Sequence, residues 1–258
     1  VSSSATAYPD FFRVVPSDAL QGQALSAVVQ ADSPADGTVG LVHMTNAYGS
    51  GLADAFTADF EAAGNTLCTT IGYEETMTDF SAAVQSMVDN GCTSAVLVSY
   101  AADGGMIIDE MNSQSWAGQV YGGDGIAEEG LATEATSSVN GVIATKPASA
   151  STGAVGYAFA ALCAQSADCT GGIYTAEAFD GVVLVALAAF AQMASPGATL
   201  SQVMMATGQG LAGASGDISF MANGDVPGAG YCVGDFTEDA DGVSFDCNRS
   251  WDPANGMS

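Results

Sequence analysis

The sequence predicts an α/β protein in which one lobe is a nearly complete open sheet of parallel strands. Residues 20–146 alternate strand-like and helix-like segments, and the strand-like segments are mainly apolar runs, as buried parallel strands are. A tyrosine or an acid follows three of these strands, namely Tyr48, Tyr100 and Asp124. After this lobe the pattern changes, because helical segments follow one another with little strand between them. The chain therefore contains one lobe and pieces of another.

The elements of the lobe follow from apolar spacing and from capping residues. Ser17 and Asp18 suit the start of a first helix, and Gly64 suits the end of the second. The expected strands are 39–45, 66–73, 94–100, 119–122 and 141–145, preceded by a short strand at 11–16. The expected helices are 19–31, 51–63, 80–90 and 103–113. This alternation is typical of consecutive βα units.

The remainder of the chain is mostly helical and then turn-rich. Helices are expected at 153–165, 175–194 and 200–207, and strand-like segments at 218–246. The longest apolar run, Gly181–Ala191, is too short to span a bilayer, so we expect a buried helix. We expect residues 1–19 and 147–228 to form a hinge and part of the other lobe, and 229–258 to form a hairpin that returns to the first lobe.

Charge is the outlying property of the composition. The 258 residues hold 29 Asp and Glu against Arg13, Lys146 and Arg249, for a net charge of −26. Such a field repels nucleic acid and anionic lipid and keeps a protein soluble. With so few cations, most surface carboxylates have no ionic partner. We interpret this acidic surface as adaptation to a salty medium, and expect no nucleic-acid partner.

The six cysteines predict disulfides and an oxidising compartment. Six cysteines allow many pairings, but a hairpin argues for one of them. If 231–236 pairs with 243–247, Phe236 faces Val243 and Cys232 falls opposite Cys247. Two further pairs are expected, one from proximity in sequence at a helix end and one by elimination: Cys163 with Cys169, and Cys68 with Cys92.

Motifs for metal binding or catalysis are weak. No cysteines form a CxxC pair and the one histidine is His43, mid-strand, which argues against a zinc site and a catalytic triad. The run 239–242 is similar to a calcium loop, but Thr237 and Asn248 stand where that loop needs its first Asp and its last Glu. We expect no cofactor, no metal and no enzymatic activity.

Ten short stretches carry a resemblance to a known family. They are Phe11-Phe12-Arg13, Ser17-Asp18, Gln21-Gly22, 48–52, 78–81, 96–100, 122–125, 174–181, 216–220 and 223–225. In order and spacing they resemble the leucine/isoleucine/valine-binding family of extracellular solute-binding proteins of ABC transporters. The resemblance implies a type I periplasmic-binding-protein fold, with one nearly complete flavodoxin-like lobe and part of a second lobe.

The resemblance departs from the family at its beginning. Family members begin with a further βα region that builds most of the first lobe and holds the ligand's carboxylate, and the matching stretches lack it. We therefore expect either a fragment, whose first part is cleaved or supplied separately as a partner chain, or a reduced relative with another task. No signal peptide precedes Val1, which indicates a mature or trimmed chain.

The resemblance also implies the binding residues and the function. It places Tyr48, Tyr100 and Asp124 at positions where family members contact amino-acid ligands, and all three also follow strands of an open sheet, where ligands bind. The alternative is packing for the tyrosines and a turn for Asp124. The implied function is a periplasmic or secreted receptor, with or without a lipid anchor, that delivers an amino acid or similar amphiphile to an ABC-transporter permease. The alternative is a structural or interaction protein with a lost or altered pocket.

Overall fold

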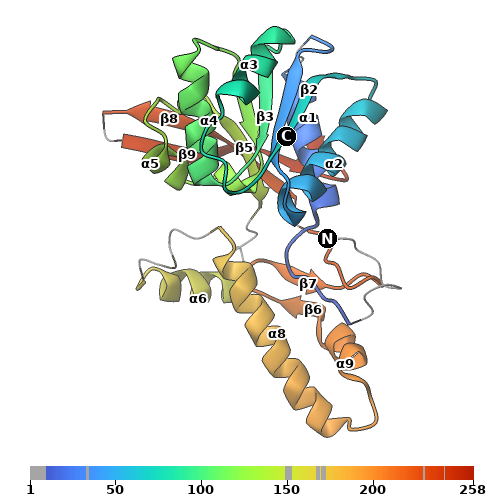
Figure 1. Cartoon of the computed structure of the whole chain (residues 1–258). Helices are drawn as coiled ribbons and strands as arrows, with labels where there is room; N and C mark the ends of the chain where they lie inside the picture. Colours follow the sequence, from blue (N-terminus) through green and yellow to red (C-terminus); the bar gives the residue numbers. More distant parts are fainter. Residues whose placement is uncertain are drawn as a thin grey trace. The chain divides into compact units, whose positions relative to one another are not determined.

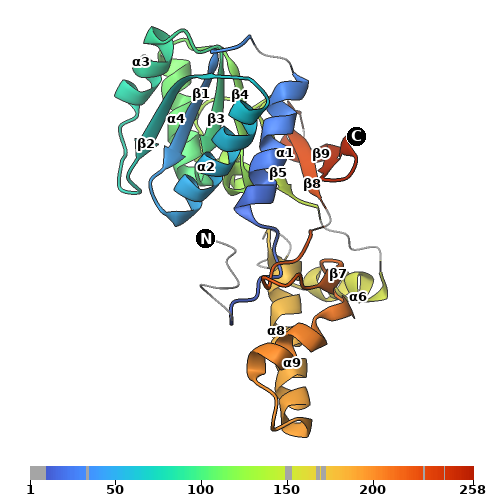
Figure 2. The same cartoon turned by 90° about the vertical axis from the view of Figure 1, so that its right-hand side faces the viewer.

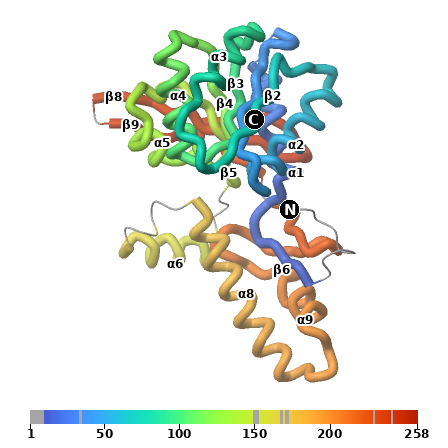
Figure 3. The backbone as a smooth tube through the Cα atoms, viewed as in Figure 1, coloured from blue at the N-terminus to red at the C-terminus, as the bar shows by residue number. Residues whose placement is uncertain are grey.

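The chain folds into two compact units, each with its own core (Figure 1). The computed structural model describes residues 10–32, 35–148, 153–166, 169, 173–228, 230–240 and 242–258. Asp18–Lys146 and Gly230–Ser258 make up the first unit, and Ser2–Ser17 and Pro147–Ala229 the second. Figure 3 traces the chain as it leaves the first unit and returns to it as the C-terminal strands.

The first unit is built on an eight-stranded sheet with the order β10-β9-β8-β5-β4-β3-β1-β2. Its parallel part consists of β1 (Val39–Met44), β2 (Leu67–Tyr73), β3 (Ser94–Val98), β4 (Gln119–Gly122) and β5 (Ile143–Pro147). The order 2-1-3-4-5 is that of a flavodoxin-like doubly wound sheet, in which the strand order reverses between β1 and β3. The predicted fold class is thereby confirmed.

Helices cover both faces of this sheet (Figure 2). The helices of the unit are α1 (Asp18–Ala31), α2 (Ala47–Ala62), α3 (Ser81–Asp89), α4 (Ala101–Ser113) and α5 (Gly130–Glu134). Alternate residues of one strand enter different cores: Leu41 packs with α1 and α2, whereas Val42 packs with α3 and α4. The parallel strands are therefore buried on both sides, which explains their apolar runs.

The C-terminal hairpin consists of β8 (Tyr231–Asp239) and β9 (Gly242–Asp252), with β10 (Gly256–Met257) beside β9. Cys232 is bonded to Cys247 as predicted, but the predicted register is wrong. Phe236 lies opposite Phe245, not Val243, because the turn is tight and Asp239 already pairs with Gly242. From Gly234 to Asp239 the pairing is shifted by two residues, and beyond a bulge after Val233 Cys232 lies opposite Ser250 instead of Cys247.

The other two disulfides also have the expected pairing. Cys68 on β2 is bonded to Cys92, which precedes β3. Cys163, at the end of a helix, is bonded to Cys169. Each bond therefore joins segments that are close in sequence, with separations of 24, 6 and 15 residues for Cys68–Cys92, Cys163–Cys169 and Cys232–Cys247.

The second unit contains three helices and a small antiparallel sheet in its described residues. They are α6 (Ala154–Cys163), α8 (Thr175–Ala194), α9 (Leu200–Thr207), β6 (Gln209–Ala212) and β7 (Asp217–Ser219). Leu184, Ile218, Phe220 and Val226 form its core.

The predicted strand at 11–16 is wrong. Instead of a strand, the backbone forms an isolated β-bridge between Arg13 and Asp225. The side chains of the same two residues form an ion pair, with Arg13 Nη2 2.7 Å from Asp225 Oδ1. Pro16 has no N–H to extend a ladder. An ion pair, not a strand, therefore fastens this segment to the unit.

The prediction of a buried helix at 181–191 is also wrong. The helix forms as part of α8, but Val182, Phe190 and Met193 are 71%, 72% and 80% exposed. By length and apolar composition alone, α8 is also the described helix that would suffice to cross a membrane. The apolar run does form a helix, but the described residues leave one of its faces uncovered.

Candidate ligand-binding site

Tyr48 is positioned by the start of α2, directly after β1. The Asn46 side chain caps the helix by accepting a 2.7 Å hydrogen bond from the Gly49 N–H. The helix therefore begins at Ala47, four residues before the predicted start, and Tyr48 lies in its first turn. A Cβ on Gly49 would lie 2.1 Å from the Met44 carbonyl oxygen, so the tight strand-to-helix connection depends on this glycine.

Tyr100 and Asp124 follow the next two strands of the sheet. Tyr100 is the N-cap of α4, directly after β3, so this helix also begins earlier than predicted. Asp124 opens the short 3₁₀ helix Asp124–Ile126, directly after β4. The carboxyl ends of β1, β3 and β4 lie at one edge of the sheet, beside the point where its order reverses.

The structure brings Asp124 and Tyr48 into direct contact. Asp124 is 6% exposed, and its Oδ1 accepts a hydrogen bond of 3.0 Å from the Tyr48 hydroxyl. The same hydroxyl accepts a bond of 3.2 Å from the Gly125 N–H. A second donor to Asp124 Oδ1 is Gln21 Nε2 of α1, at 2.8 Å. Two side chains from different helices therefore orient the carboxylate.

The two tyrosines form a stacked pair. Their ring centroids are 5.2 Å apart and their planes differ by 16°. Tyr48 is partly buried beside Asp124, whereas Tyr100 is 48% exposed and presents aromatic surface. A carboxylate beside an aromatic surface can bind a molecule that joins an amine to an apolar body.

Burial, reinforced by nearby negative charge, raises the pKa of both phenols. Burial, and then the negative charge of Asp124, raises the pKa of Tyr48 well above the usual value for tyrosine. Burial also raises the pKa of Tyr100, with smaller contributions from Asp124 and Glu75. Both side chains are therefore neutral hydroxyl groups, and the negative charge of the site resides on carboxylates.

Gln21 joins the candidate site through its bond to Asp124, although no pattern in the sequence indicated this contact. It is 4% exposed, and its Nε2 also lies 3.3 Å from the Thr145 carbonyl oxygen. Gln21 and Asp124 are 103 residues apart and belong to different elements, so the spacing of residues within one helix or strand could not predict their contact. The feature of the sequence that could have drawn attention to Gln21 is its place in Gln21-Gly22, one of the short stretches that resemble the family.

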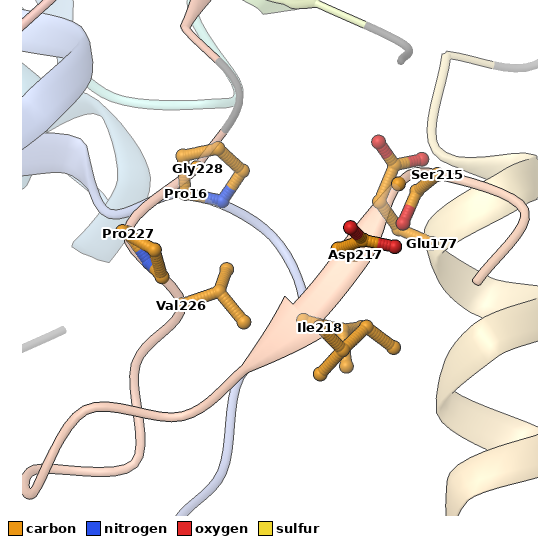
Figure 4. Close-up of a pocket in the computed structure, with 10 residues that line it drawn as sticks. Pro16, Glu177, Ser215, Asp217, Ile218, Val226, Pro227 and Gly228 are labelled. Atoms are coloured by element: carbon orange, nitrogen blue, oxygen red, sulfur yellow. The ribbon is translucent and has the colours of Figure 1, made fainter. Parts of the chain in front are cut away.

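A hollow of about 210 Å³ lies within the second unit (Figure 4). Glu177, Asp217 and Ser215 contribute its polar groups, and Ile218 and Val226 part of its apolar wall. Burial, and to a lesser extent the charge of Asp180, raises the pKa of Glu177. The neighbouring Asp180 accepts hydrogen bonds of 2.6 and 2.8 Å from the N–H groups of Ala214 and Ser215. These bonds give Asp180 a structural task in joining α8 to the loop before β7.

Comparisons with known proteins agree with this architecture. The family model described as the receptor family ligand binding region matches residues 1–239. Leu/Ile/Val-binding protein homolog 3 of Brucella melitensis is 28% identical over 127 residues, or 48% of this chain and 33% of that protein. Homolog 2 of Brucella abortus is 30% identical over 134 residues, or 52% of this chain and 36% of that protein. These matches thus span about a third of the curated relatives.

Solved structures show the same fold at low identity. The leucine-binding protein LivK of Thermotoga maritima superposes with a TM-score of 0.78 at 19% identity, covering 94% of this chain and 68% of that one. A solute-binding protein from R. palustris in complex with 4-hydroxybenzoate gives 0.79 at 15% identity, covering 98% and 70%. The chain belongs to the receptor ligand-binding-region family, with solute-binding proteins of the Leu/Ile/Val-binding group among its relatives.

Proposed function

We propose that the chain belongs to an extracellular solute receptor that binds an amino acid or a similar small amphiphile and delivers it to an ABC transporter. In this proposal Asp124 receives the ligand's ammonium group, and Tyr48 and Tyr100 line the pocket. The observation that carries it is the carboxylate of Asp124, almost fully buried and oriented by Gln21 and Tyr48 beside a stacked aromatic pair.

The charge of the site favours an amine over an aromatic acid. Solved relatives include proteins in complex with benzoate and 4-hydroxybenzoate. In this chain a carboxylate placed beside Asp124 would meet a like charge, whereas an ammonium would meet an opposite one. Burial of a ligand charge without a partner is costly, so the pairing decides which class of molecule binds.

Calorimetry with a panel of small molecules tests this proposal. The protein expressed from its complete reading frame is titrated with zwitterionic amino acids, polyamines, short amides and benzoates. We expect binding of an amino acid or close analogue and none of the benzoates. Binding of benzoates alone would contradict the role of Asp124. If no compound of the panel binds, an interaction protein with a lost or altered pocket becomes the better hypothesis.

A further inference from the structure

The hollow of the second unit contains a carboxyl group that is buried without a cationic partner. Glu177, in the first turn of α8, is 6% exposed, and glutamate is rarely buried to this extent unless it is paired. Its carboxyl accepts a hydrogen bond from its own backbone N–H, and no other hydrogen bond or ion pair reaches it among the described residues. A buried carboxylate is costly without an opposite charge.

The second unit has no free cation to offer this carboxyl. It contains Arg13 as its single Lys or Arg, and no histidine. The Nε and Nη2 atoms of Arg13 donate hydrogen bonds of 2.8 and 2.7 Å to Asp225 Oδ1. Lys146 and Arg249 have their own contacts within the first unit. A cation beside Glu177 would therefore come from another molecule.

Two further oxygen acceptors lie beside Glu177. Figure 4 shows the polar ends of Glu177, Ser215 and Asp217 gathered at one end of the hollow. The Ser215 hydroxyl donates its hydrogen to Asp180 over 2.6 Å, so its oxygen remains available as an acceptor. Ionised carboxylates accept hydrogen bonds and donate none, whereas a primary ammonium group has three N–H donors. This end of the hollow therefore suits an ammonium group.

The rest of the wall is apolar and the hollow is small. Ile218 and Val226, which are 2% and 8% exposed, line it together with Pro16 and Pro227. Its volume of about 210 Å³ is below the range of about 300–1,000 Å³ that drug-sized ligands occupy. The occupant is therefore a molecule with a short hydrocarbon chain.

Three segments that are distant in sequence build this hollow. Val14 and Pro16 precede the point where the chain first enters the first unit, and Pro227 and Gly228 precede the point where it returns there. Glu177 comes from α8, between these two segments in sequence. The arrangement therefore exists only in the folded unit.

We propose that this hollow is a binding site for a small primary alkylammonium ion, separate from the site at Asp124 in the first unit. The ammonium group lies among Glu177, Ser215 and Asp217, and the hydrocarbon chain packs against Ile218. A carboxylate ligand would meet two like charges here. A metal ion is disfavoured, because the described residues contain no group of three or more His, Cys, Asp or Glu side chains that could hold one.

Methyl NMR of the protein expressed from its complete reading frame tests the proposal. The protein carries isotope-labelled isoleucine methyl groups and is titrated with n-butylammonium chloride, with n-butanol and butyrate as neutral and anionic controls. Added KCl screens unspecific attraction to the acidic surface. The Ile218 methyl reports on the hollow, and the Ile126 methyl reports on the site at Asp124.

We expect butylammonium to shift the Ile218 signal to saturation, whereas butanol and butyrate should not. Glu177→Gln should weaken this binding about 30-fold or more, because the ammonium loses a buried opposite charge. Asp217→Asn removes an exposed charge and should weaken it about two- to fivefold. The matched control Glu61→Gln, on the exposed end of α2, should leave the affinity unchanged.

Equal shifts of Ile218 with butanol and butylammonium would overturn the proposal. So would a shift of Ile126 alone, a stronger effect of calcium chloride than of butylammonium, or unchanged affinity in Glu177→Gln. If Glu177→Gln does not fold, unchanged affinity in Asp217→Asn would overturn it.

Discussion

At Asp124, two neutral donors on separate helices hold one oxygen of a buried carboxylate. The Gln21 amide and the Tyr48 hydroxyl donate hydrogen bonds of 2.8 and 3.0 Å to this oxygen. Both donors are uncharged, so they orient the carboxylate without neutralising it. In the proposed site their tasks would therefore differ from that of Asp124, because they would position the carboxylate that receives the ligand's ammonium group. Substitutions at these residues can separate positioning from charge.

Removing either donor should weaken ligand binding without abolishing it. Gln21→Leu and Tyr48→Phe each delete one hydrogen bond to Asp124, and we expect each to cost about 1 kcal/mol of binding free energy. Tyr48→Ala also removes aromatic contact and should cost about 1–3 kcal/mol. Calorimetry measures these losses, with Gln85→Leu on the exposed side of α3 as the control. Unchanged affinity in Gln21→Leu would argue against positioning by this amide.

Asp109 should make the stability of the first unit sensitive to acid. Burial raises the pKa of this carboxyl, but hydrogen bonds from Thr136 and Ser137 outweigh burial and lower it below its usual value. A lowered folded-state pKa adds stability above the unfolded-state pKa, near 4, and this stability is lost as pH falls through the folded value. Asp109→Asn should therefore destabilise the protein at pH 7 more than at about pH 3. Denaturant titrations at both pH values measure the difference in unfolding free energy between the wild-type protein and Asp109→Asn. The same difference at both pH values would show that ionisation of Asp109 does not contribute to stability.

At the scale of elements, the alternation of strands and helices in the first unit was predictable, whereas their exact starts were not. Buried parallel strands are apolar runs of short length, so β1 and β3 were evident. The helices α2 and α4 begin soon after their strands, at Ala47 and Ala101, because Asn46 and Tyr100 act as N-caps. Capping by Tyr100 has no side-chain hydrogen bond and therefore no signature in the sequence.

Contacts between different elements were harder to predict than the elements themselves. The register of β8 and β9 depends on how tightly the turn closes, which residue composition alone left open. The bond from Gln21 to Asp124 depends on how α1 packs against the sheet. The exposure of α8 was missed because an apolar run shows that the side chains are hydrophobic but not what covers them. The sequence thus predicted the elements and the residues at the strand ends, but not the pairing of side chains between elements or the exposure of α8.

The three disulfides should differ in their contribution to stability. In the chain-entropy model the contribution grows with loop length, giving about 3.5 kcal/mol for Cys68–Cys92, about 3 for Cys232–Cys247 and about 2 for Cys163–Cys169. Paired Cys→Ser variants, measured by reversible denaturation, should lose stability in this order. Free thiols at Cys232 and Cys247 in non-reduced peptide maps would contradict the structure of the hairpin.

At the scale of the whole molecule, the few cations are all engaged inside it. Arg13 pairs with Asp225 at 2.7 Å, and Arg249 approaches Asp235 at 3.2 Å. The Lys146 ammonium lies 4.8 Å from the centre of the Phe245 ring. Most of the 29 acids consequently face water without a cationic partner.

Stability should therefore rise with salt. At a net charge of −26, added ions screen repulsion between exposed carboxylates, over a Debye length of about 8–10 Å near physiological ionic strength. The Tm should increase between low and molar KCl, and a neutral osmolyte of equal osmolality provides the control. A Tm that does not change with KCl would contradict adaptation to a salty medium.

The proposed function depends most on the charge of Asp124, and the affinity of an Asp124 variant tests it most directly. Asp124→Ala would leave a bound ammonium unpaired, whereas Asp54→Ala on the exposed side of α2 removes the same charge away from the site. For an amino-acid ligand identified by calorimetry, we expect Asp124→Ala to weaken binding by about 2–5 kcal/mol, roughly 30-fold or more. Asp54→Ala should leave the affinity unchanged. Equal affinities for the wild-type protein and Asp124→Ala would contradict the role of Asp124 in binding the ammonium group.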